Sequence, residues 1–515
     1  MTRSGASMRD DRVARLEILG RRWKESAAIP AMTFWSAVYV LVVATDSGFD
    51  TSYLNFGWQL VPWDVLSSDP LRSVWYLHVQ PPGWNLFLGV PAWLSPLSDR
   101  VTVQLLMLGL GLVVVALAAT LARELGLGRR ASVAVALVAT LHPEVLKGVF
   151  EPNYELGVAA LLLAVAVAVS RLESTSNFGR RFVSLSAVLT VLVMTRSLYH
   201  PILLMVILAV LGVWGRRRLD RRSLIVAVLV PLVLVGGWMV KNQVLFGQAN
   251  LSSWFGMNLQ RAVIPVLDRD DLEQMYANGE VSDIAMVGPF GDYGLYEPFV
   301  EPCTPSHSHR SLTEPRRTTD DVSPNFNFEC FLPVFEQAGD DAWAVIRAHP
   351  EAWVEGRLWS LRTTFAVATS PGDSPSIVMR VLDDVYSVTR IDYRGVLTTE
   401  GWGTPIYGRL VAPTDFGLLL VGVYGVLIVA GVGVVVRGSL RKRMDVGDWT
   451  IAVAAVLAAF TVVVGAVAEL GEQSRFRTAV DPLATVVVSV LLARFVSRMR
   501  DRRKRNQSQA ASVGS

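Results

Sequence analysis

The sequence predicts an all-α polytopic membrane protein with an extracytoplasmic soluble domain of α or α+β type. Apolar stretches of about twenty residues recur along the chain, basic residues gather in short connections, and one long polar insertion interrupts the pattern. Runs of that length cannot face water, and they match the hydrocarbon thickness of a bilayer. Of the 515 residues, 51% are hydrophobic and only 18% are charged. A soluble chain carries about a quarter charged residues, so this composition favours a membrane protein.

The apolar runs predict about ten transmembrane helices by the usual length criterion. We expect them near residues 31–45, 101–122, 131–148, 154–170, 182–198, 200–215, 223–240, 414–436, 449–468 and 478–493. The segment 83–97 is also apolar, but it is short and contains Pro91 and Pro96. Proline kinks or ends a helix, so an interfacial or re-entrant piece is favoured there over a full span.

Lysine and arginine predict the orientation of the chain. They crowd short segments at residues 3–24, 123–130, 171–181, 216–222, 437–443 and 494–505. Such segments stay on the cytoplasmic side of a membrane, and all of them fall there if the N-terminus is inside. A full span at 83–97 would move Arg129 and Arg130 outside, against this rule. The basic residues are not gathered on one soluble module, which excludes a nucleic-acid partner.

The predicted domain organisation follows from the spans and their orientation in the cell membrane, with both termini cytoplasmic. The chain divides into a basic cytoplasmic segment (1–30), an N-terminal transmembrane module with an external loop at 46–82 (31–241), an extracytoplasmic domain (242–412), C-terminal transmembrane helices (413–497) and a disordered cytoplasmic tail (498–515). The cytoplasmic loops are short and basic. We therefore expect any catalytic site to lie on the extracytoplasmic side of the membrane.

The extracytoplasmic domain holds both cysteines of the chain, Cys303 and Cys330. Disulfides persist outside the cytoplasm, and closing a loop of this length stabilises by roughly 3–4 kcal/mol in the chain-entropy model. A metal site with His307 and His309 is the alternative, but the short Cys-x-x-Cys spacing of zinc sites is missing. We therefore favour a disulfide. Apolar residues repeat at helical spacing over 334–361, which predicts amphipathic helices there.

The first external loop carries the candidate catalytic residues. Asp46 and Asp50 follow the first span directly, Tyr53 comes next, and His78 precedes a double proline. An acid just above the hydrocarbon is partly shielded from water, so its charged form is disfavoured and it can serve as a general base near neutral pH. His78 is equally well explained as an interfacial residue.

Further ionisable and polar residues sit at predicted outer ends of spans. Arg196 lies within an apolar run, where burying a charge is costly, and this favours a functional role. A side chain that extends to the membrane interface (snorkelling) explains it equally well. Lys241 ends one span on the outside against the charge rule, which suggests an anionic partner. Arginine binds phosphate through two parallel hydrogen bonds. Cations gathered at the outer ends of these spans would therefore suit a phosphodiester held in the membrane. The remaining candidates near this mouth are Glu151, Glu155, Asn242, Glu472, Arg475 and Arg477.

These motifs, in this order, resemble the GT-C superfamily of polytopic glycosyltransferases, especially bacterial members of the dolichyl-phosphate-mannose-protein mannosyltransferase and lipopolysaccharide-core transferase type. The resemblance covers most of the chain. It is carried by Asp50 with Tyr53, His-x-Gln-Pro-Pro-x-x-Asn at 78–85, Trp-Met-Val-Lys-Asn at 238–242 with the following Phe246-Gly247, Ser252 and Gly256-Met-Asn258, and Glu472-x-x-Arg475-x-Arg477 with Asp481-Pro482.

The resemblance implies an inverting membrane glycosyltransferase. Such enzymes move a sugar from a polyprenyl-phosphate donor to an envelope glycan, lipid or protein acceptor on the outer face of the cytoplasmic membrane. It implies a base in the first loop and cations on the donor phosphate. The site residues expected are Asp50, Asp46 and His78 for catalysis, Lys241, Arg475, Arg477 and Arg196 for the donor phosphate, and Tyr53, Gln80, Asn85, Glu151, Glu155, Asn242 and Glu472 for substrate.

The chain departs from the family pattern in its first loop. Members often show adjacent Asp-Glu there, whereas Asp46 is followed by Ser47 and Asp50 by Thr51. The base therefore stays open between the two aspartates. No metal ligands are assigned, and a divalent cation, Mg²⁺ or Mn²⁺, stays an open alternative as cofactor. A secondary transporter and a non-enzymatic envelope-assembly protein are the rival functions.

Overall fold

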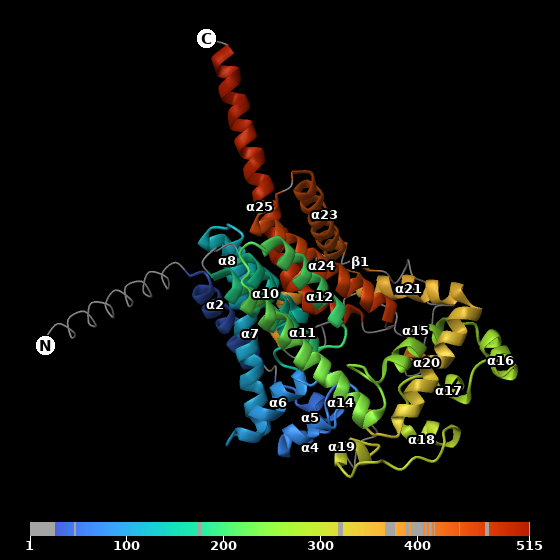
Figure 1. The fold of residues 1–515 in the computed structure, drawn as a ribbon. Coiled ribbons are helices and arrows are strands. Elements are labelled where there is room, and N and C mark those ends of the chain that lie inside the picture. Colours follow the sequence, from blue (N-terminus) through green and yellow to red (C-terminus); the bar gives the residue numbers. More distant parts are fainter. Residues whose placement is uncertain are drawn as a thin grey trace.

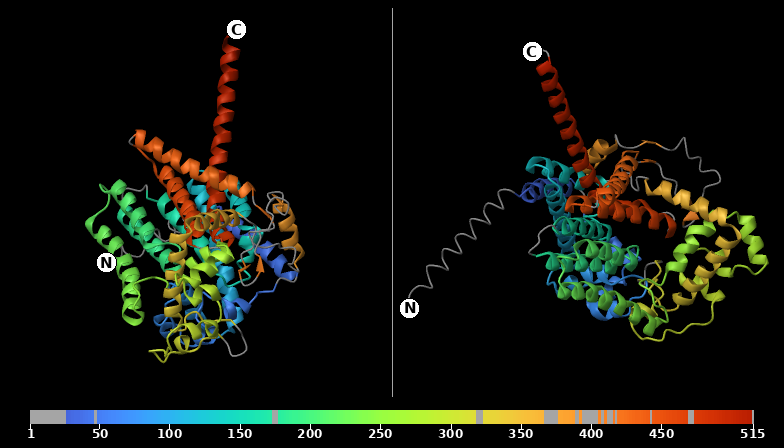
Figure 2. Two further views of the ribbon diagram at one scale, coloured as in Figure 1. Left: turned by 90° about the vertical axis from the view of Figure 1, so that its right-hand side faces the viewer. Right: turned by 45° about the horizontal axis from the view of Figure 1, so that its top comes forward.

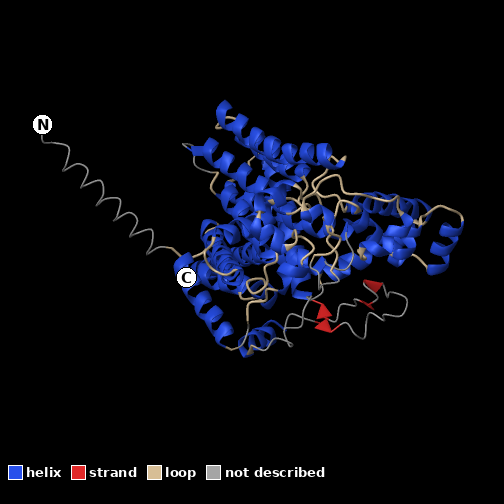
Figure 3. Cartoon of the chain, turned by 90° about the horizontal axis from the view of Figure 1, so that it is seen from below, coloured by secondary structure: helices blue, strands red, loops and turns tan. Residues whose placement is uncertain are grey.

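The structure is a computed structural model of the chain. It describes residues 26–45, 48–172, 177–317, 323–365, 376–387, 391–392, 405–406, 409–410, 415–416, 418–441, 443–468 and 473–513. Most of these residues are helical, and the strands occupy one small region (Figure 3). The all-helical class predicted from the sequence is confirmed.

A bundle of long apolar helices forms the body of the molecule (Figure 1). Its helices are α2 (Ala28–Ala44), α7 (Asp99–Glu124), α8 (Arg129–Thr140), α10 (Glu155–Ser170), α11 (Phe178–Thr195), α12 (Pro201–Gly215), α13 (Arg221–Pro231), the π-helical turn η2 (Leu232–Gly236), α14 (Gly237–Phe246), α23 (Leu418–Arg441), α24 (Val446–Ala468) and α25 (Gln473–Val513).

Six helices in the described part are long and apolar enough to cross a membrane. They are Asp99–Glu124, Phe178–Thr195, Arg221–Phe246, Leu419–Arg441, Val446–Val467 and Arg475–Gln509. Three shorter apolar helices, α2, α10 and α12, coincide with further predicted spans. The protein is therefore a multi-pass membrane protein, and the count of about ten spans stays a prediction.

The predicted span at 131–148 is interrupted. Helix α8 has only 12 residues and ends at Thr140, and a separate turn, α9 (Pro143–Lys147), follows. The cause is Pro143, because the residue before a proline is pushed out of helical geometry. His142 accordingly has φ −55° and ψ 130°.

Helix α10 lies at the centre of the bundle. Thirteen of its 16 residues are buried, and it packs against α7, α11, α24 and α25. A helix that is apolar on every side belongs in a core. This position matters for function, because the first residue of α10 is the buried carboxylate Glu155.

The predicted loop 46–82 is folded against the bundle in short helices. These are α3 (Ser52–Phe56), α4 (Trp63–Ser68), α5 (Pro70–Trp75) and, after the double proline, α6 (Gly83–Leu94). Helix α6 has 12 residues with Pro91 inside, and it is not among the candidate membrane helices. The buried Arg317 ties this loop to the region 242–412 by donating from Nη1 to the Leu60 carbonyl oxygen at 2.5 Å.

The region 242–412 contributes a group of shorter helices beside the bundle (Figures 1 and 2). They are α15 (Phe255–Val263), the 3₁₀ turn η3 (Ile264–Val266), α16 (Arg269–Ala277), α17 (Asp283–Val287), α18 (Tyr293–Tyr296), η4 (Glu297–Phe299), α19 (Arg310–Thr313), α20 (Phe331–Ala348), α21 (Pro350–Thr364) and α22 (Ile377–Ser387). Two antiparallel strand pairs follow, β1 (Ile391–Asp392) with β4 (Asp415–Phe416), which lies just beyond this region, and β2 (Pro405–Ile406) with β3 (Arg409–Leu410).

These helices enclose a small core of their own. Leu259, Ala262 and Val263 of α15 meet Ala342 and Val345 of α20 there. Helix α20 buries residues at positions i, i+3, i+4 and i+7 from Phe331, which is the pattern of an amphipathic helix. The prediction of an amphipathic helix is confirmed for α20, which covers the first part of the range 334–361.

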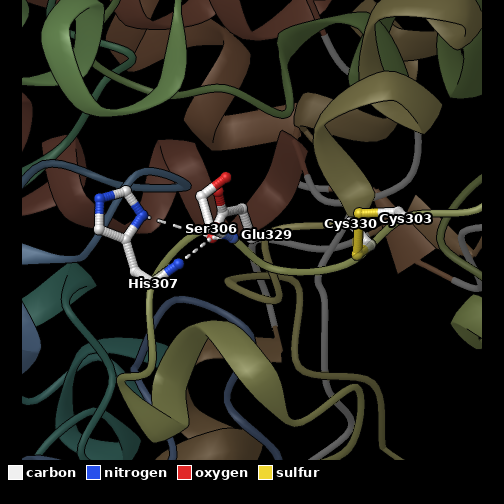
Figure 4. Close-up of a disulfide and its surroundings, with 5 residues drawn as sticks. All are labelled: Cys303, Ser306, His307, Glu329 and Cys330. Atoms are coloured by element: carbon white, nitrogen blue, oxygen red, sulfur yellow. Dashed lines mark hydrogen bonds and ion pairs between the residues drawn. A yellow bond between two sulfur atoms is a disulfide. The ribbon is translucent and has the colours of Figure 1, made fainter.

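The predicted disulfide is present. Cys303 and Cys330 have an S–S distance of 2.06 Å and a Cα–Cα distance of 5.7 Å. Figure 4 shows Glu329 beside this bridge, accepting a hydrogen bond from the Ser306 backbone N–H at 3.0 Å and pairing with His307 at 3.5 Å. Within the described residues, no three His, Cys, Asp or Glu side chains gather as a metal site.

Residues 498–513, where the sequence predicts a disordered tail, lie in helix α25. Helix α25 continues to Val513 and projects beyond the bundle in both views of Figure 2. Arginine, lysine, glutamine and alanine are all good helix formers, so the helix propagates past the end of its apolar stretch.

Candidate active site

A cavity of about 570 Å³ lies where the bundle meets the first loop and the region 242–412. Its wall is mostly apolar and aromatic, with a few amide and hydroxyl groups, and such a lining is typical of ligand pockets. The basic side chains of the wall are two arginines and one histidine, and no described wall residue is a carboxylate. The polar and aromatic lining residues are Trp58, Gln59, Gln80, Tyr154, Arg196, Ser197, His200, Asn250, Ser252, Trp254, Phe255, Asn258, Arg261, Phe290 and Phe476.

Arg196 enters this cavity from the short connection between two bundle helices. Helix α11 ends at Thr195, and Arg196 itself is extended, with φ −144° and ψ 122°. Pro201 at the first position of α12 restricts how early the next helix can begin. The connection therefore places the arginine at the mouth of the bundle and not inside it.

The Arg196 side chain is 3% exposed and lies between two rings. Its guanidinium carbon is 4.5 Å from the centre of the Tyr154 ring and 4.3 Å from that of Phe476. Nη1 lies 3.9 Å from Glu155 Oε1, but neither Nη1 nor Nη2 makes a hydrogen bond within the described part of the chain. A buried cation with spare donors is suited to an anionic ligand.

Glu155 joins Arg196 to a second arginine. Its Oε1 accepts hydrogen bonds from Arg475 Nε at 3.2 Å and Nη2 at 3.0 Å. Glu155 is the first residue of α10, where the helix dipole favours negative charge. Arg475 comes from the third residue of α25, so three helix ends meet here.

The first loop reaches the same place through Tyr53. The Tyr53 hydroxyl lies 2.6 Å from Gln59 Oε1 and 3.2 Å from Asn153 Oδ1, and Arg475 Nη2 lies 3.5 Å from that same Asn153 oxygen. The structure thus brings together four of the predicted site residues, which are Tyr53, Glu155, Arg196 and Arg475.

Asp50 lies at the edge of this group. Its Oδ1 accepts hydrogen bonds from the Ser52 backbone N–H at 2.8 Å and hydroxyl at 2.5 Å, and its backbone N–H donates to the Phe150 carbonyl at 2.9 Å. The side chain is exposed, so the partial shielding from water that the sequence predicts for this acid is not found at Asp50. Glu151 nearby pairs with Lys147 at 3.2 Å on the surface. The two other predicted acids, Asp46 and Glu472, lie outside the described residues.

Lys241 and His78 form a separate cluster. Lys241 Nζ donates to the Leu77 carbonyl at 2.6 Å and lies 3.7 Å from the centre of the Trp238 ring. Asn242 beside it donates to the Asn250 carbonyl at 2.8 Å. Lys241 is not among the residues that line the cavity. The Lys241 amino group anchors the start of the His-x-Gln-Pro-Pro stretch, and we do not assign it a role in phosphate binding.

Both ring nitrogens of His78 are engaged. Nε2 lies 3.1 Å from the Asn327 carbonyl oxygen, which can only accept, so Nε2 carries the proton. Nδ1 then accepts from the Ser253 hydroxyl at 2.7 Å. Burial lowers the pKa of His78 to about 3, with Lys241 adding to the shift. This geometry makes His78 a neutral link between the first loop and the region 242–412.

The stability of the protein should therefore fall in mild acid. The folded-state pKa of His78 lies below the value near 6.5 of an unfolded histidine, so the unfolded chain takes up the proton first. The contribution is complete above pH 6.5 and is lost as the pH falls toward 3. We expect the unfolding midpoint to drop between pH 7.5 and 5, and to drop less in His78→Gln. Equal slopes in the two proteins would contradict this role.

The other two polar residues of this motif have different roles: one supports the first loop, and the other lines the cavity. Asn85 is fully buried, accepting from the Val61 backbone N–H and donating to the Gln59 carbonyl, both at 2.9 Å. Gln80 lines the cavity. Asn85 therefore shapes the first loop, whereas Gln80 is placed to contact a ligand.

Arg477 is enclosed in a different network. It is fully buried, and it donates to Glu144 Oε2 and to Asp481 Oδ2, each at 2.6 Å. The Tyr424 hydroxyl donates to Asp481 Oδ1 at 3.1 Å. Arg475 and Arg477 thus point to different sides of α25. Arg477 joins α9, α23 and α25 and does not line the cavity.

Several cavity residues were missed by sequence reasoning. Arg261, Trp254 and Trp58 line the wall. The helical spacing of 254, 258 and 261 is a signal that could have flagged one polar face of a short helix. Trp58 carries no such signal, because only the folded loop brings it to the cavity.

Comparisons with known proteins add little. No family model matches the sequence, and no curated protein matches it. Among solved structures, the chain is similar to the apo crystal structure of ArnT from Cupriavidus metallidurans, with 15% identity, a TM-score of 0.30, and coverage of 89% of this chain and 76% of that one.

Proposed function

We propose that this protein is a membrane glycosyltransferase. It moves a sugar from a polyprenyl-phosphate donor to an envelope glycan, lipid or protein acceptor on the outer face of the cytoplasmic membrane. The observation that carries the proposal is the cavity wall, which is mostly apolar and contains buried arginines but no described carboxylate. A lipid phosphate needs both an apolar surface and fixed cations.

Arg196 in the cavity wall is placed to hold the donor phosphate, and Arg475, which is not itself a lining residue, supports it through Glu155. Both arginines contact Glu155, whose carboxylate orients the two guanidinium groups and offsets the repulsion between them. The Nη1 and Nη2 atoms of Arg196 make no hydrogen bond within the described part of the chain. Preorganised cations at the point where charge develops are among the strongest catalytic devices. Here charge develops on the departing phosphate.

The proposed reaction is a single displacement. The acceptor hydroxyl oxygen attacks the anomeric carbon, and the bond from that carbon to the phosphate oxygen breaks. The bonding electron pair leaves with the phosphate, and the hydroxyl proton passes to the carboxylate of Asp50 or Asp46. One displacement inverts the anomeric centre and needs no second carboxylate nucleophile. Neither Mg²⁺ nor Mn²⁺ takes part in this step as proposed.

The position of the charged groups favours surface chemistry over transport. A secondary transporter holds its ionisable groups at broken helices near the bilayer midplane. Here Glu155 begins α10, Arg196 follows the end of α11, and Arg475 lies in the first turn of α25. A purely structural membrane protein would have no need for a cation-lined cavity.

The proposal is tested in the native host with Arg475→Gln. Mass spectrometry of envelope glycans and lipids is compared between cells lacking the protein and cells making the wild type or the variant. We expect one sugar increment to vanish without the protein and to fall on the order of 10²-fold in the variant. Arg500→Gln, on the exposed part of the same helix, is the matched control and should restore the increment fully.

Two results would overturn the proposal. One is the absence of any glycan or lipid difference between cells with and without the protein. The other is specific uptake of a labelled solute into proteoliposomes carrying the purified chain, which would establish a transporter.

A further inference from the structure

Helix α22 carries an exposed row of apolar side chains. Ile377, Val381 and Val385 recur every four residues, so they lie along one side of this helix. They are 56%, 54% and 60% exposed, respectively. Because aliphatic side chains are stabilised when they leave water, three of them in one exposed row favour an apolar partner.

The opposite side of α22 is packed against the protein. Met379 is 4% exposed and belongs to the hydrophobic core that this helix shares with the bundle, and Leu382 packs against the same core. The helix contacts α2 and α9. These contacts fix the rotation of α22 about its own axis, so the apolar row stays on the outside of the molecule.

Both ends of α22 are attached to the ends of bundle helices. The hydroxyl of Ser376, just before the helix, lies 2.8 Å from that of Thr45, which follows α2. At the other end, the Tyr386 hydroxyl donates to the Val138 carbonyl oxygen in the last turn of α8 at 2.7 Å. With a rise of about 1.5 Å per residue, the helix extends about 15 Å between these two attachments. It therefore runs across the ends of α2 and α8 on one side of the bundle.

Exposed apolar side chains also surround the helix ends that α22 crosses. Val40, Leu41 and Val43 near the end of α2 are 60%, 53% and 41% exposed, and Val138 of α8 is 54% exposed. On the apolar helices of a multi-pass membrane protein, such side chains are covered by lipid. The apolar row of α22 therefore adjoins a surface that already meets the membrane.

A basic residue borders the row. Arg380 is exposed and lies one helical turn after Ile377. An apolar side flanked by a cation is typical of helices that lie in the plane of a membrane surface. A helix that crosses the ends of membrane helices is also at the level of the lipid headgroups.

We propose that α22 lies in the membrane interface, with Ile377, Val381 and Val385 against lipid acyl chains and Arg380 toward the headgroup phosphates. This inference does not depend on the proposed function. Because α22 is attached to Thr45, such an anchor holds the beginning of the first loop at the membrane surface.

Spin labels on the full chain in lipid nanodiscs test this placement. Both native cysteines form the disulfide, so an introduced cysteine is the one thiol that reacts with the label. The variants Ile377→Cys, Val381→Cys, Val385→Cys and Arg380→Cys each receive a nitroxide. Power saturation then measures its collisions with oxygen, which concentrates in lipid, and with a nickel chelate, which stays in water. We expect the oxygen-to-nickel collision ratio to be at least threefold higher at the three apolar positions than at Arg380.

Two further labelled positions calibrate the scale. Val429→Cys lies on the membrane helix α23 at a residue that is 71% exposed, and it should give the ratio of a site that faces lipid. Glu273→Cys on the exposed side of α16 should give the ratio of a site in water. All the labelled residues are exposed, so each variant should keep the unfolding midpoint of the wild type.

Two outcomes overturn the inference. A ratio at Val381 and Val385 equal to that at Glu273 places the helix in water. Few collisions with either reagent at these positions place protein on the apolar row, as a second copy of the chain or another segment of it would. Neither outcome bears on sugar transfer, so the proposed function stands or fails separately.

Discussion

Replacing Arg477 by methionine is expected to destabilise the protein by about 3–5 kcal/mol. The substitution roughly keeps the side-chain volume but leaves Glu144 and Asp481 buried without the cation that both contact at 2.6 Å. A buried carboxylate that loses its partner suffers the full cost of desolvation. Reversible unfolding of the full chain in mixed micelles gives the free energy of unfolding directly.

The control for this experiment is a surface ion pair. Arg437 Nη2 lies 2.5 Å from Asp448 Oδ1, but the arginine side chain is 43% exposed. Exposed pairs contribute at most about 1 kcal/mol, so Arg437→Met should be nearly neutral. The triple variant Arg477→Met, Glu144→Gln and Asp481→Asn should recover part of the stability. A loss no larger for Arg477→Met than for Arg437→Met would remove Arg477 as a structural tie.

Sugar transfer is expected to fall by roughly 10²–10⁴-fold when the catalytic base is made unable to accept a proton. Asp50→Asn keeps an oxygen that can accept the Ser52 hydrogen bonds at the start of α3, but it cannot take the acceptor proton. The loop should therefore keep its conformation while the reaction slows. Asp46→Asn is made in parallel, because the two aspartates are competing candidates for the base.

The readout is transfer by membranes containing equal amounts of each protein. Asp64→Asn is the matched control, since Asp64 is an acid of the same loop that is half exposed and pairs with Arg310 at 2.9 Å on the surface. It should transfer at the wild-type rate. Wild-type transfer by both Asp46→Asn and Asp50→Asn would end the proposal that either is the base.

The fold class and much of the architecture could be predicted because they depend on local patterns. Hydropathy located the bundle helices, and the oxidising compartment implied by the topology pointed to the Cys303–Cys330 bridge. Helix boundaries were less predictable. The break after Thr140 and the continuation of α25 to Val513 depend on a proline and on helix propensity, not on hydropathy.

The candidate site was only half predictable. Arg196 stood out because an ionisable side chain within an apolar run is costly, and Arg475 was a candidate as a cation able to bind phosphate; Glu155 was one of several candidates near the same helix ends. His78 and Lys241 carried a similar signal, yet their partners are Asn327, Ser253 and the Leu77 carbonyl, which fold back over them.

The sequence by itself determined that this is a helical membrane protein with charged groups where its helices end, because hydropathy and charge are properties of each segment alone. Only the tertiary structure decided which of those charged groups lie at the cavity and which make structural contacts that hold loops and helices together. A side chain's role depends on the groups it meets, and here Arg475 meets Glu155 from a helix more than three hundred residues away in the chain.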